Sequence, residues 1–217
     1  MGTTHFDLII FDCDGVLVDS ERITNAVFAE MLNDLGLSLT LEDMFEQFVG
    51  NSMQQCLKMI ETMLGEKPPS DFVSNYRQRT KLALQQQLKP VRGIRQTLDR
   101  LSLPYCVASS SDREKMETTL GITGILPYFQ GKLFSVTEVE RGKPFPDVYL
   151  YAAEKMNAQP SRCLVIEDTP IGVRGGVSAG MIVGGYAELM NAEKLQQAGA
   201  HFVFEDMSQI PNLIQSM

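Results

Sequence analysis

The sequence predicts an α/β fold in which a parallel sheet with flanking helices is interrupted by an inserted all-helical block. From residue 90 onward, short apolar runs alternate with amphipathic segments, which is typical of parallel strands joined by right-handed helical crossovers. Between residues 20 and 89, helical periodicity continues and no convincing strand is present. The first apolar run, residues 6–11, precedes this block, and we expect it to pair with the later strands.

The inserted block is predicted to consist of helices separated by glycine-containing breaks. Ile23, Val27 and Met31 recur at helical spacing, and Gly36 is placed to end this first helix. The segment Gly65–Pro69 interrupts the pattern a second time. The predicted helices cover residues 23–35, 41–49, 53–64 and 72–88. We therefore divide the chain into an α/β core, residues 1–17 and 90–217, and a helical domain, residues 18–89.

The chain after residue 90 is predicted to alternate between helices and strands. Asp112 and Glu114 suit the positive end of a helix dipole, and Gly180 is placed to end a later helix. The predicted strands are residues 105–108, 132–136, 163–166, 181–184 and 202–204. The predicted helices are residues 93–101, 112–120, 145–156, 171–179, 188–198 and 208–215.

The composition is that of a globular protein of a reducing compartment. Of the 217 residues, 44% are hydrophobic, and no apolar stretch is long enough to span a membrane. The formal net charge of -8 argues against binding to nucleic acid or to an anionic membrane. The N-terminus lacks a signal-peptide pattern, and the four cysteines form no Cys-x-x-Cys pair. We expect a cytoplasmic protein, with a monomer as the default state.

Polar clusters follow several of the predicted strands. Asp12 and Asp14 come directly after the first strand, and Ser109–Ser111 follow the second. Lys143 lies in a proline-stiffened turn, and Glu167–Asp168 end a later strand. Because ligands bind at the carboxyl ends of strands in open α/β sheets, we expect these side chains to share one site. Oxygen ligands of this kind suit Mg²⁺.

Each of these residues, taken singly, has an ordinary structural explanation. An isolated Asp-x-Asp pair or serine caps a turn or a helix, and an isolated lysine or acidic pair lies on the surface. Their joint occurrence at strand ends favours a functional site. We expect His5 and His201 to be surface residues and Cys13 to pack beneath the loop as a small apolar side chain.

Four separated motifs resemble those of the haloacid dehalogenase superfamily. They are Asp12-x-Asp14-Gly15-Val16, Ser109 after a strand, Lys143-Pro144 and Glu167-Asp168. The segment from Asp14 to Glu21 is similar to the subgroup of sugar-phosphate phosphatases and β-phosphoglucomutases. The resemblance implies a Rossmann-like core with an inserted four-helix cap, which is the helical domain of residues 18–89.

The resemblance also implies a role for each motif in phosphoryl transfer. Asp12 would be the nucleophile that forms an aspartyl-phosphate, and Asp14 would be the general acid and base. Ser109 would hydrogen-bond a phosphoryl oxygen, and Lys143 would hold the phosphate and Asp12 together. The implied Mg²⁺ ligands are the carboxylates of Asp12, Glu167 and Asp168 and the backbone carbonyl of Asp14.

The expected reaction is Mg²⁺-dependent hydrolysis of a small phosphorylated metabolite, a sugar phosphate or a sugar-acid phosphate. Residues of the cap and of the serine loop are the candidates to contact this substrate. They are Glu21, Thr24, Gly50, Asn51, Ser52, Ser110 and Ser111.

Three other functions fit the sequence less well than hydrolysis does. β-Phosphoglucomutases carry a histidine at the position of Thr24 and an arginine at that of Met53, so this chain departs from the mutase pattern at both. Haloalkanoic-acid dehalogenation requires neither Asp14 nor the acidic pair Glu167–Asp168. A signalling receiver domain lacks the inserted helices and the spacing of Asp12 and Asp14.

Overall fold

The chain divides into two compact units in a computed structural model that describes residues 6–49 and 51–217. The first unit joins the chain up to Asp19 with Lys89–Met217. The second unit is the intervening segment Ser20–Leu88. Two chain crossings therefore connect the units, and their facing ends are paired by a hydrogen bond from Asp19 N to Lys89 O at 2.9 Å.

The first unit is built on a six-stranded sheet, counted over residues 6–49 and 51–217, in which every pairing is parallel. The strand order β3-β2-β1-β4-β5-β6 is a doubly wound arrangement. The strands are β1 Leu8–Phe11, β2 Tyr105–Ser109, β3 Leu133–Ser135, β4 Cys163–Glu167, β5 Ile182–Tyr186 and β6 Phe202–Phe204.

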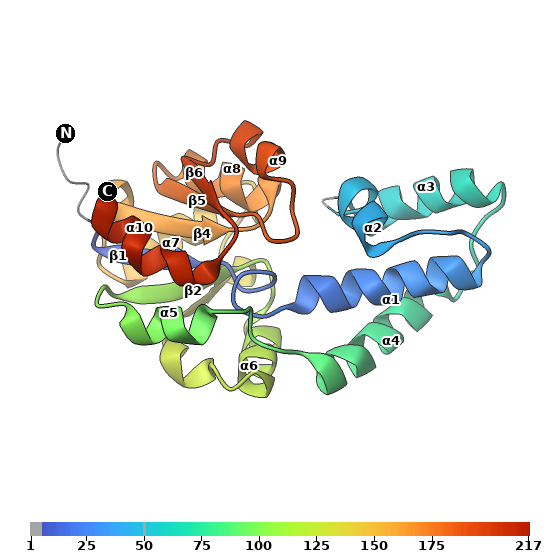
Figure 1. Ribbon diagram of the computed structural model, residues 1–217, viewed down its shortest axis with the longest axis horizontal. Coiled ribbons are helices and arrows are strands. Elements are labelled where there is room, and N and C mark those ends of the chain that lie inside the picture. The colour runs from blue at the N-terminus through green and yellow to red at the C-terminus, as the bar shows by residue number, and fades with distance from the viewer. Residues whose placement is uncertain (1–5, 50) are drawn as a thin grey trace. The chain divides into compact units, whose positions relative to one another are not determined.

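The first strand pairs with later strands, as the sequence predicts, and it lies at the centre of the sheet. In Figure 1 the blue β1 runs between the green β2 and the orange β4. Ile10 is in register with Cys106 on one side and with Val165 on the other. All four residues of β1 are buried, because a parallel sheet is covered on both faces. The residues that follow β1 are therefore held between the ends of its two neighbours.

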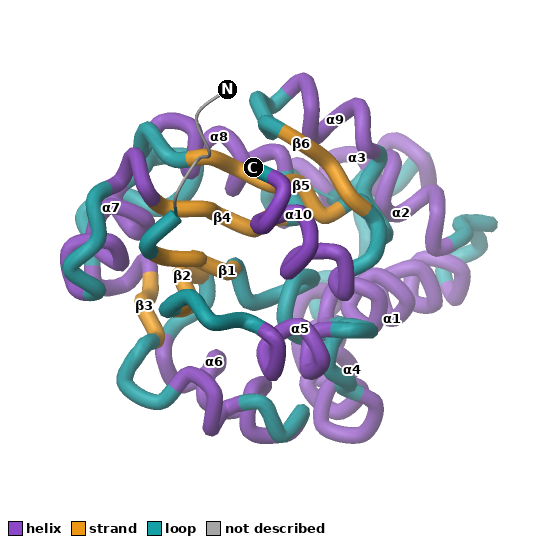
Figure 2. Tube along the Cα trace, turned by 60° about the vertical axis from the view of Figure 1, so that its left-hand side comes forward, coloured by secondary structure: helices purple, strands orange, loops and turns teal. Residues whose placement is uncertain are grey.

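Helices cover both faces of this sheet. In Figure 2, α7 and α8 lie on one side of the strands, and α5 and α10 lie on the other. Contacts between α7 and α8, and between α8 and α9, extend the first layer along the sheet. The helices of this unit are α5 Ile94–Arg100, α6 Arg113–Ile122, α7 Asp147–Lys155, α8 Pro170–Ser178, α9 Ala192–Gln197 and α10 Ile210–Ser216.

The predicted elements differ from the observed ones mainly at their ends. The helix predicted over 188–198 begins only at Ala192, because Asn191 caps it by accepting a hydrogen bond from Glu193 N. The strand predicted over 132–136 stops at Ser135, where the chain turns into a short 3₁₀ segment, Val136–Glu138. The helix predicted over 145–156 begins at Asp147, directly after Pro146.

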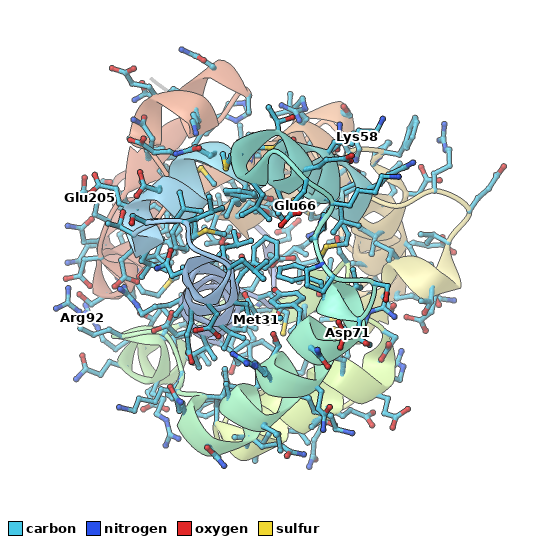
Figure 3. All side chains as sticks on the ribbon, turned by 90° about the vertical axis from the view of Figure 1, so that its right-hand side faces the viewer. Met31, Lys58, Glu66, Asp71, Arg92 and Glu205 are labelled. Carbon is cyan, nitrogen blue, oxygen red and sulfur yellow. The ribbon has the colours of Figure 1, made fainter. Side chains whose placement is uncertain are left out.

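The second unit contains four helices among its described residues and has its own apolar core. They are α1 Ser20–Asp34, α2 Leu41–Gln47, α3 Met53–Leu64 and α4 Phe72–Gln87. Phe28 packs against the rings of Phe48 and Phe72 at centroid distances of 5.6 Å and 5.7 Å. Met31 is buried in the same cluster, whereas Lys58 is exposed (Figure 3). This unit thus buries its apolar faces internally.

Within residues 6–49 and 51–217, every helix is too short or too polar to cross a lipid bilayer. The four cysteines are free thiols, and each of them is buried.

Candidate active site

Asp12 lies at the carboxyl end of β1, between strand ends formed by Ser109 and Glu167. Its backbone N–H donates to Ile166 O at 2.9 Å, which extends the ladder to β4 by one bond. The residue is 7% exposed, so its carboxylate is nearly removed from water. A buried carboxylate requires a charged or hydrogen-bonding partner, and Lys143 supplies one.

Lys143 holds three elements together through its ammonium group. Its Nζ donates to Asp12 Oδ1 at 2.5 Å, to Glu167 Oε1 at 2.6 Å and to Ala108 O at 3.0 Å. An ammonium has three donors, so these bonds saturate it. The lysine side chain is 3% exposed. The ammonium therefore acts as a fixed, desolvated positive charge at the junction of β1, β2 and β4.

The charges of this cluster shift one another's pKa values. Burial raises the pKa of Asp12 to about 7, although the adjacent Lys143 opposes that shift. Burial alone would lower the pKa of Lys143, but Asp12 and Glu167 outweigh it and raise that pKa well above its ordinary value. Lysine therefore stays charged throughout the neutral range.

Glu167 has both carboxylate oxygens engaged by protein donors. Its Oε1 accepts from Lys143 and from the hydroxyl of Tyr149, the latter at 2.7 Å. Its Oε2 accepts from Asp168 N at 3.1 Å and from Thr169 N and Oγ1 at 3.2 Å and 3.0 Å. Burial would raise the pKa of Glu167, but the ammonium of Lys143 reverses the shift and lowers it. Glu167, predicted as a metal ligand, thus anchors Lys143 in this structure.

A glycine makes room for this anchor. A Cβ at Gly172, in the first turn of α8, would lie 1.8 Å from Glu167 Oε1. Any side chain there would displace the carboxylate and break the hydrogen bonds that hold it. The hydroxyl of Tyr149 also reaches Gly172 O at 3.3 Å, which ties α7 to α8 beside the carboxylate.

Asp14 lies two residues beyond Asp12, on a tight turn. Gly15 adopts a left-handed φ of 81°, and its N–H donates to Val18 O at 2.8 Å. Oδ2 of Asp14 accepts from Ser111 Oγ at 2.7 Å and from Lys115 Nζ at 3.0 Å. The Asp14 side chain is 18% exposed and that of Asp12 is 10% exposed, so Asp14 is the more accessible of the two to water.

The serine loop joins the end of β2 to the first turn of α6. Ser109 is buried, and its hydroxyl accepts from Ser111 N at 3.0 Å, while Ser110 is exposed. Ser135, at the end of β3, donates its hydroxyl to Ser111 O at 2.8 Å. Backbone N–H groups that precede a helix attract anions, so this loop suits a phosphate group.

The candidate residues of the helical unit have local structural partners. Thr24 Oγ1 donates to Glu21 O at 3.2 Å, within one turn of α1. Asn51 Nδ2 donates to Gln47 O at 2.9 Å, and Ser52 caps α3 in a reciprocal pair with Gln55. Gly50 lies outside the residues that the structure describes. The structure thus explains these polar side chains locally, whatever further role they have.

A profile of the family described as haloacid dehalogenase-like hydrolase matches residues 9–185. The chain belongs to this family. The hydrolase is also 31% identical to the 6-phosphogluconate phosphatase of Escherichia coli (strain K12) over 183 residues, covering 83% of this chain and 82% of that protein. It is 28% identical to a phosphorylated carbohydrates phosphatase of Thermotoga maritima, with 89% and 92% of the two chains covered.

Solved structures show the same fold over nearly the whole hydrolase. A haloacid dehalogenase-like protein of unknown function from Agrobacterium tumefaciens superimposes with a TM-score of 0.93 at 33% identity, covering 98% of this chain and 99% of that one. A HAD family hydrolase from Deinococcus radiodurans, crystallised with bound phosphate and sodium, gives a TM-score of 0.90 at 29% identity, covering 98% and 96%. The relatives and the fold place the hydrolase among the phosphatases of its family.

The oxygen donors near Asp12 fit a small, hard cation. Among residues 6–49 and 51–217, no group of three or more His, Cys, Asp or Glu side chains is placed to hold a metal ion. The remaining predicted donors are two carboxylates, those of Asp12 and Asp168, and one backbone carbonyl, that of Asp14. They therefore include fewer than three acidic side chains. Mg²⁺ is commonly held by one or two carboxylates, with phosphate and water completing its shell. These donors therefore suit Mg²⁺.

Three residues of the site were not predicted from the sequence. The local pattern predicts Tyr149 as an apolar residue of a helix and Ser135 as an ordinary strand residue. Nothing in the neighbouring sequence indicates that either one belongs to the site. Lys115 lies in the first turn of α6, four residues after Ser111, so helical spacing could have placed it near the serine that precedes the helix. His201, predicted to lie on the surface, is exposed, and Cys13 is buried beneath the loop.

Glu167→Gln should lower the free energy of unfolding by about 3 kcal/mol, the scale expected when one partner of a buried ion pair is removed. The change leaves the buried Lys143 with one carboxylate in place of two. Urea denaturation in chelator measures the effect, so that metal binding does not contribute. Glu154→Gln, at an exposed position of α7, is the matched control and should stay within about 0.5 kcal/mol of the wild type. Equal stability of the two variants would show that Glu167 does not anchor Lys143.

Proposed function

We propose that the hydrolase is a Mg²⁺-dependent phosphatase that transfers the phosphoryl group of a small metabolite to Asp12 and then to water. The observation that carries the proposal is the contact of Lys143 with Asp12. The lysine occupies Oδ1, and within residues 6–49 and 51–217 no other side chain hydrogen-bonds this carboxylate. Oδ2 is thus available to attack phosphorus, while its partner oxygen holds the carboxylate in a fixed orientation.

In the first step, Oδ2 of Asp12 forms a bond to phosphorus as the bond from phosphorus to the ester oxygen breaks. The leaving alkoxide of a sugar is strongly basic, so it requires a proton as it departs. Asp14, two residues along on the adjoining turn, donates that proton. The products of this step are the free alcohol, an aspartyl-phosphate on Asp12 and an ionised Asp14.

In the second step, Asp14 accepts a proton from water while the oxygen of that water attacks phosphorus. The bond between Asp12 and phosphorus breaks, which regenerates the carboxylate and releases inorganic phosphate. Asp14 ends the cycle protonated, as it began, so protons balance over the two steps. The partial exposure of Asp14 suits a group that meets both substrate and water.

Negative charge accumulates on the phosphoryl oxygens during both steps, and the surroundings of Asp12 counter it. The ammonium of Lys143 is preorganised, because its buried partners hold it in place before substrate binds. Ser109 and the N–H groups of the serine loop would hydrogen-bond the same oxygens. Mg²⁺, held by Asp12, Asp168 and the carbonyl of Asp14, would supply further positive charge there.

We further propose that the substrate is a sugar phosphate or a sugar-acid phosphate and that the helical unit acts as the cap that selects it. Support comes from the names of the relatives, which include a 6-phosphogluconate phosphatase and a phosphorylated carbohydrates phosphatase. Glu21, Thr24, Asn51 and Ser52 offer hydroxyl, amide and carboxylate groups that match sugar hydroxyls. The residue at position 24 is bonded to its own helix, and it lacks the imidazole that would favour a mutase.

Asp12→Asn should reduce turnover by at least about three orders of magnitude, because an amide cannot form the acyl phosphate. Release of p-nitrophenol from p-nitrophenyl phosphate measures the rate, and mass spectrometry of the quenched enzyme locates the phosphoryl group. Asp99→Asn, an exposed position of the same unit, should retain the wild-type rate. A variant at Asp12 that keeps more than about a tenth of the rate would exclude this residue as the nucleophile.

Chelation by EDTA should abolish activity, and added Mg²⁺ should restore it, whereas Ca²⁺ should restore little because it prefers more ligands and longer bonds. Asp168→Asn should raise the Mg²⁺ concentration required for half-maximal activity. Its stability in chelator should stay near that of the wild type, in contrast to Glu167→Gln. Full activity in excess EDTA would contradict a metal-dependent reaction.

The wild type should hydrolyse sugar phosphates and sugar-acid phosphates with higher kcat/KM than nucleoside monophosphates or a phosphoserine peptide. Phosphate release across such a panel, at one fixed Mg²⁺ concentration, provides the measurement. A preference for the phosphopeptide would contradict the proposed substrate class while leaving the reaction itself in place.

A further inference from the structure

Asp14 is held by a closed triangle of polar groups. Ser111 Oγ and Lys115 Nζ both donate to Oδ2 of Asp14, at 2.7 Å and 3.0 Å. Lys115 Nζ also donates to Ser111 Oγ at 2.9 Å, so each member contacts the other two. All three belong to the α/β unit.

The two donors are themselves fixed to the backbone. Ser111 O accepts from the buried hydroxyl of Ser135, so the end of β3 holds the serine loop. Lys115 N donates to the side chain of Asp112, the N-cap of α6, at 2.8 Å. The position of Lys115 therefore follows from the capped first turn of the helix, one turn beyond Ser111.

The turn that carries Asp14 does not by itself determine where the carboxylate points. The backbone bonds of Gly15 and Leu17 set the path of the chain, whereas an aspartate side chain has several staggered rotamers. Two donors on one oxygen select one of them. The ion pair is partly exposed, at 46% for Lys115 and 18% for Asp14, so it contributes little to stability. Its effect is on orientation.

We propose that Lys115 is a positioning residue for the reaction, which holds the Asp14 carboxylate in the orientation needed for proton exchange with the leaving group and with water. The inference rests on the proposed function, in which Asp14 is the general acid and base. Proton transfer in a catalytic step depends on short, aligned distances, so loss of the orienting charge should slow those steps that need a proton.

The dependence on the leaving group distinguishes this role from a structural one. Departure of p-nitrophenolate needs no proton donor, departure of phenolate needs some assistance, and departure of the benzyl alkoxide needs it fully. Lys115→Met should therefore slow the first step only slightly for p-nitrophenyl phosphate and roughly 10-fold or more for benzyl phosphate. The second step should slow for every substrate, because Asp14 activates water in each case.

The experiment follows pre-steady-state product formation from the two esters, and from phenyl phosphate, by rapid quench with substrate in excess over enzyme and with saturating Mg²⁺. The expected result for Lys115→Met is a rapid burst of p-nitrophenol, a slow steady state and no burst with benzyl phosphate. Lys155→Met, an exposed lysine of α7, is the matched control and should behave as the wild type. Denaturation midpoints of both variants should match the wild type. Unchanged rates for Lys115→Met, or an equal reduction of the first-step rate for all three esters, would overturn the proposal.

A double-mutant cycle tests whether Lys115 acts through the shared carboxylate. Ser111→Ala removes the other donor to the same oxygen. The double variant should therefore slow benzyl phosphate cleavage by less than the product of the two single-variant fold-reductions. Fully multiplicative effects would contradict a common target. The proposed function is tested separately, by phospho-enzyme formation in the wild type. A wild type that forms no phospho-enzyme on Asp12 would refute that function, whereas a phosphorylated wild type with an unaffected Lys115 variant would refute only the positioning role.

Discussion

A lysine ammonium buried between two carboxylates is the interaction on which the site depends. Asp12 and Glu167 end adjacent strands, and neither could remain ionised in so dry a position without the charge of Lys143. The lysine in turn could not be buried without them. The cluster therefore forms as a unit. It leaves Oδ2 of Asp12 available to react. The ammonium of Lys143 beside it is already in place, whereas water molecules would have to reorient to supply the same stabilisation.

The surrounding structure is arranged to preserve this cluster. The central place of β1 brings Asp12 between the ends of β2 and β4, and the missing side chain at Gly172 leaves space for Glu167. Burial raises the pKa of Tyr149 well above its usual value, so its hydroxyl remains a hydrogen-bond donor to Glu167. Positioning therefore extends through α7 and α8, far beyond the residues that would touch phosphate.

The two carboxylates of the proposed mechanism, Asp12 and Asp14, differ because their surroundings differ. Asp12 lies within the strand layer and has a buried cation as its partner, which suits a nucleophile held in one orientation. Asp14 lies on a turn at the surface of the unit and is bonded to a serine and to a partly exposed lysine. That environment suits a group that exchanges protons with alcohol and water. A spacing of one residue is enough to produce this difference, because the chain leaves the sheet between them.

The α/β class and the helical insertion follow from the sequence alone, and the sequence also predicts Asp12, Asp14, Ser109, Lys143 and Asp168 as members of one site. Strand ends, periodicity and charged clusters are local properties, and local properties can be read along the chain. It could not reveal that Glu167 is saturated by protein donors, or that Tyr149, Ser135 and Lys115 support the site. Those facts depend on which side chains meet across β3, β4, α6 and α7. Such contacts form only when elements distant in the sequence pack together. The number of residues between two side chains does not specify whether they come within hydrogen-bonding distance.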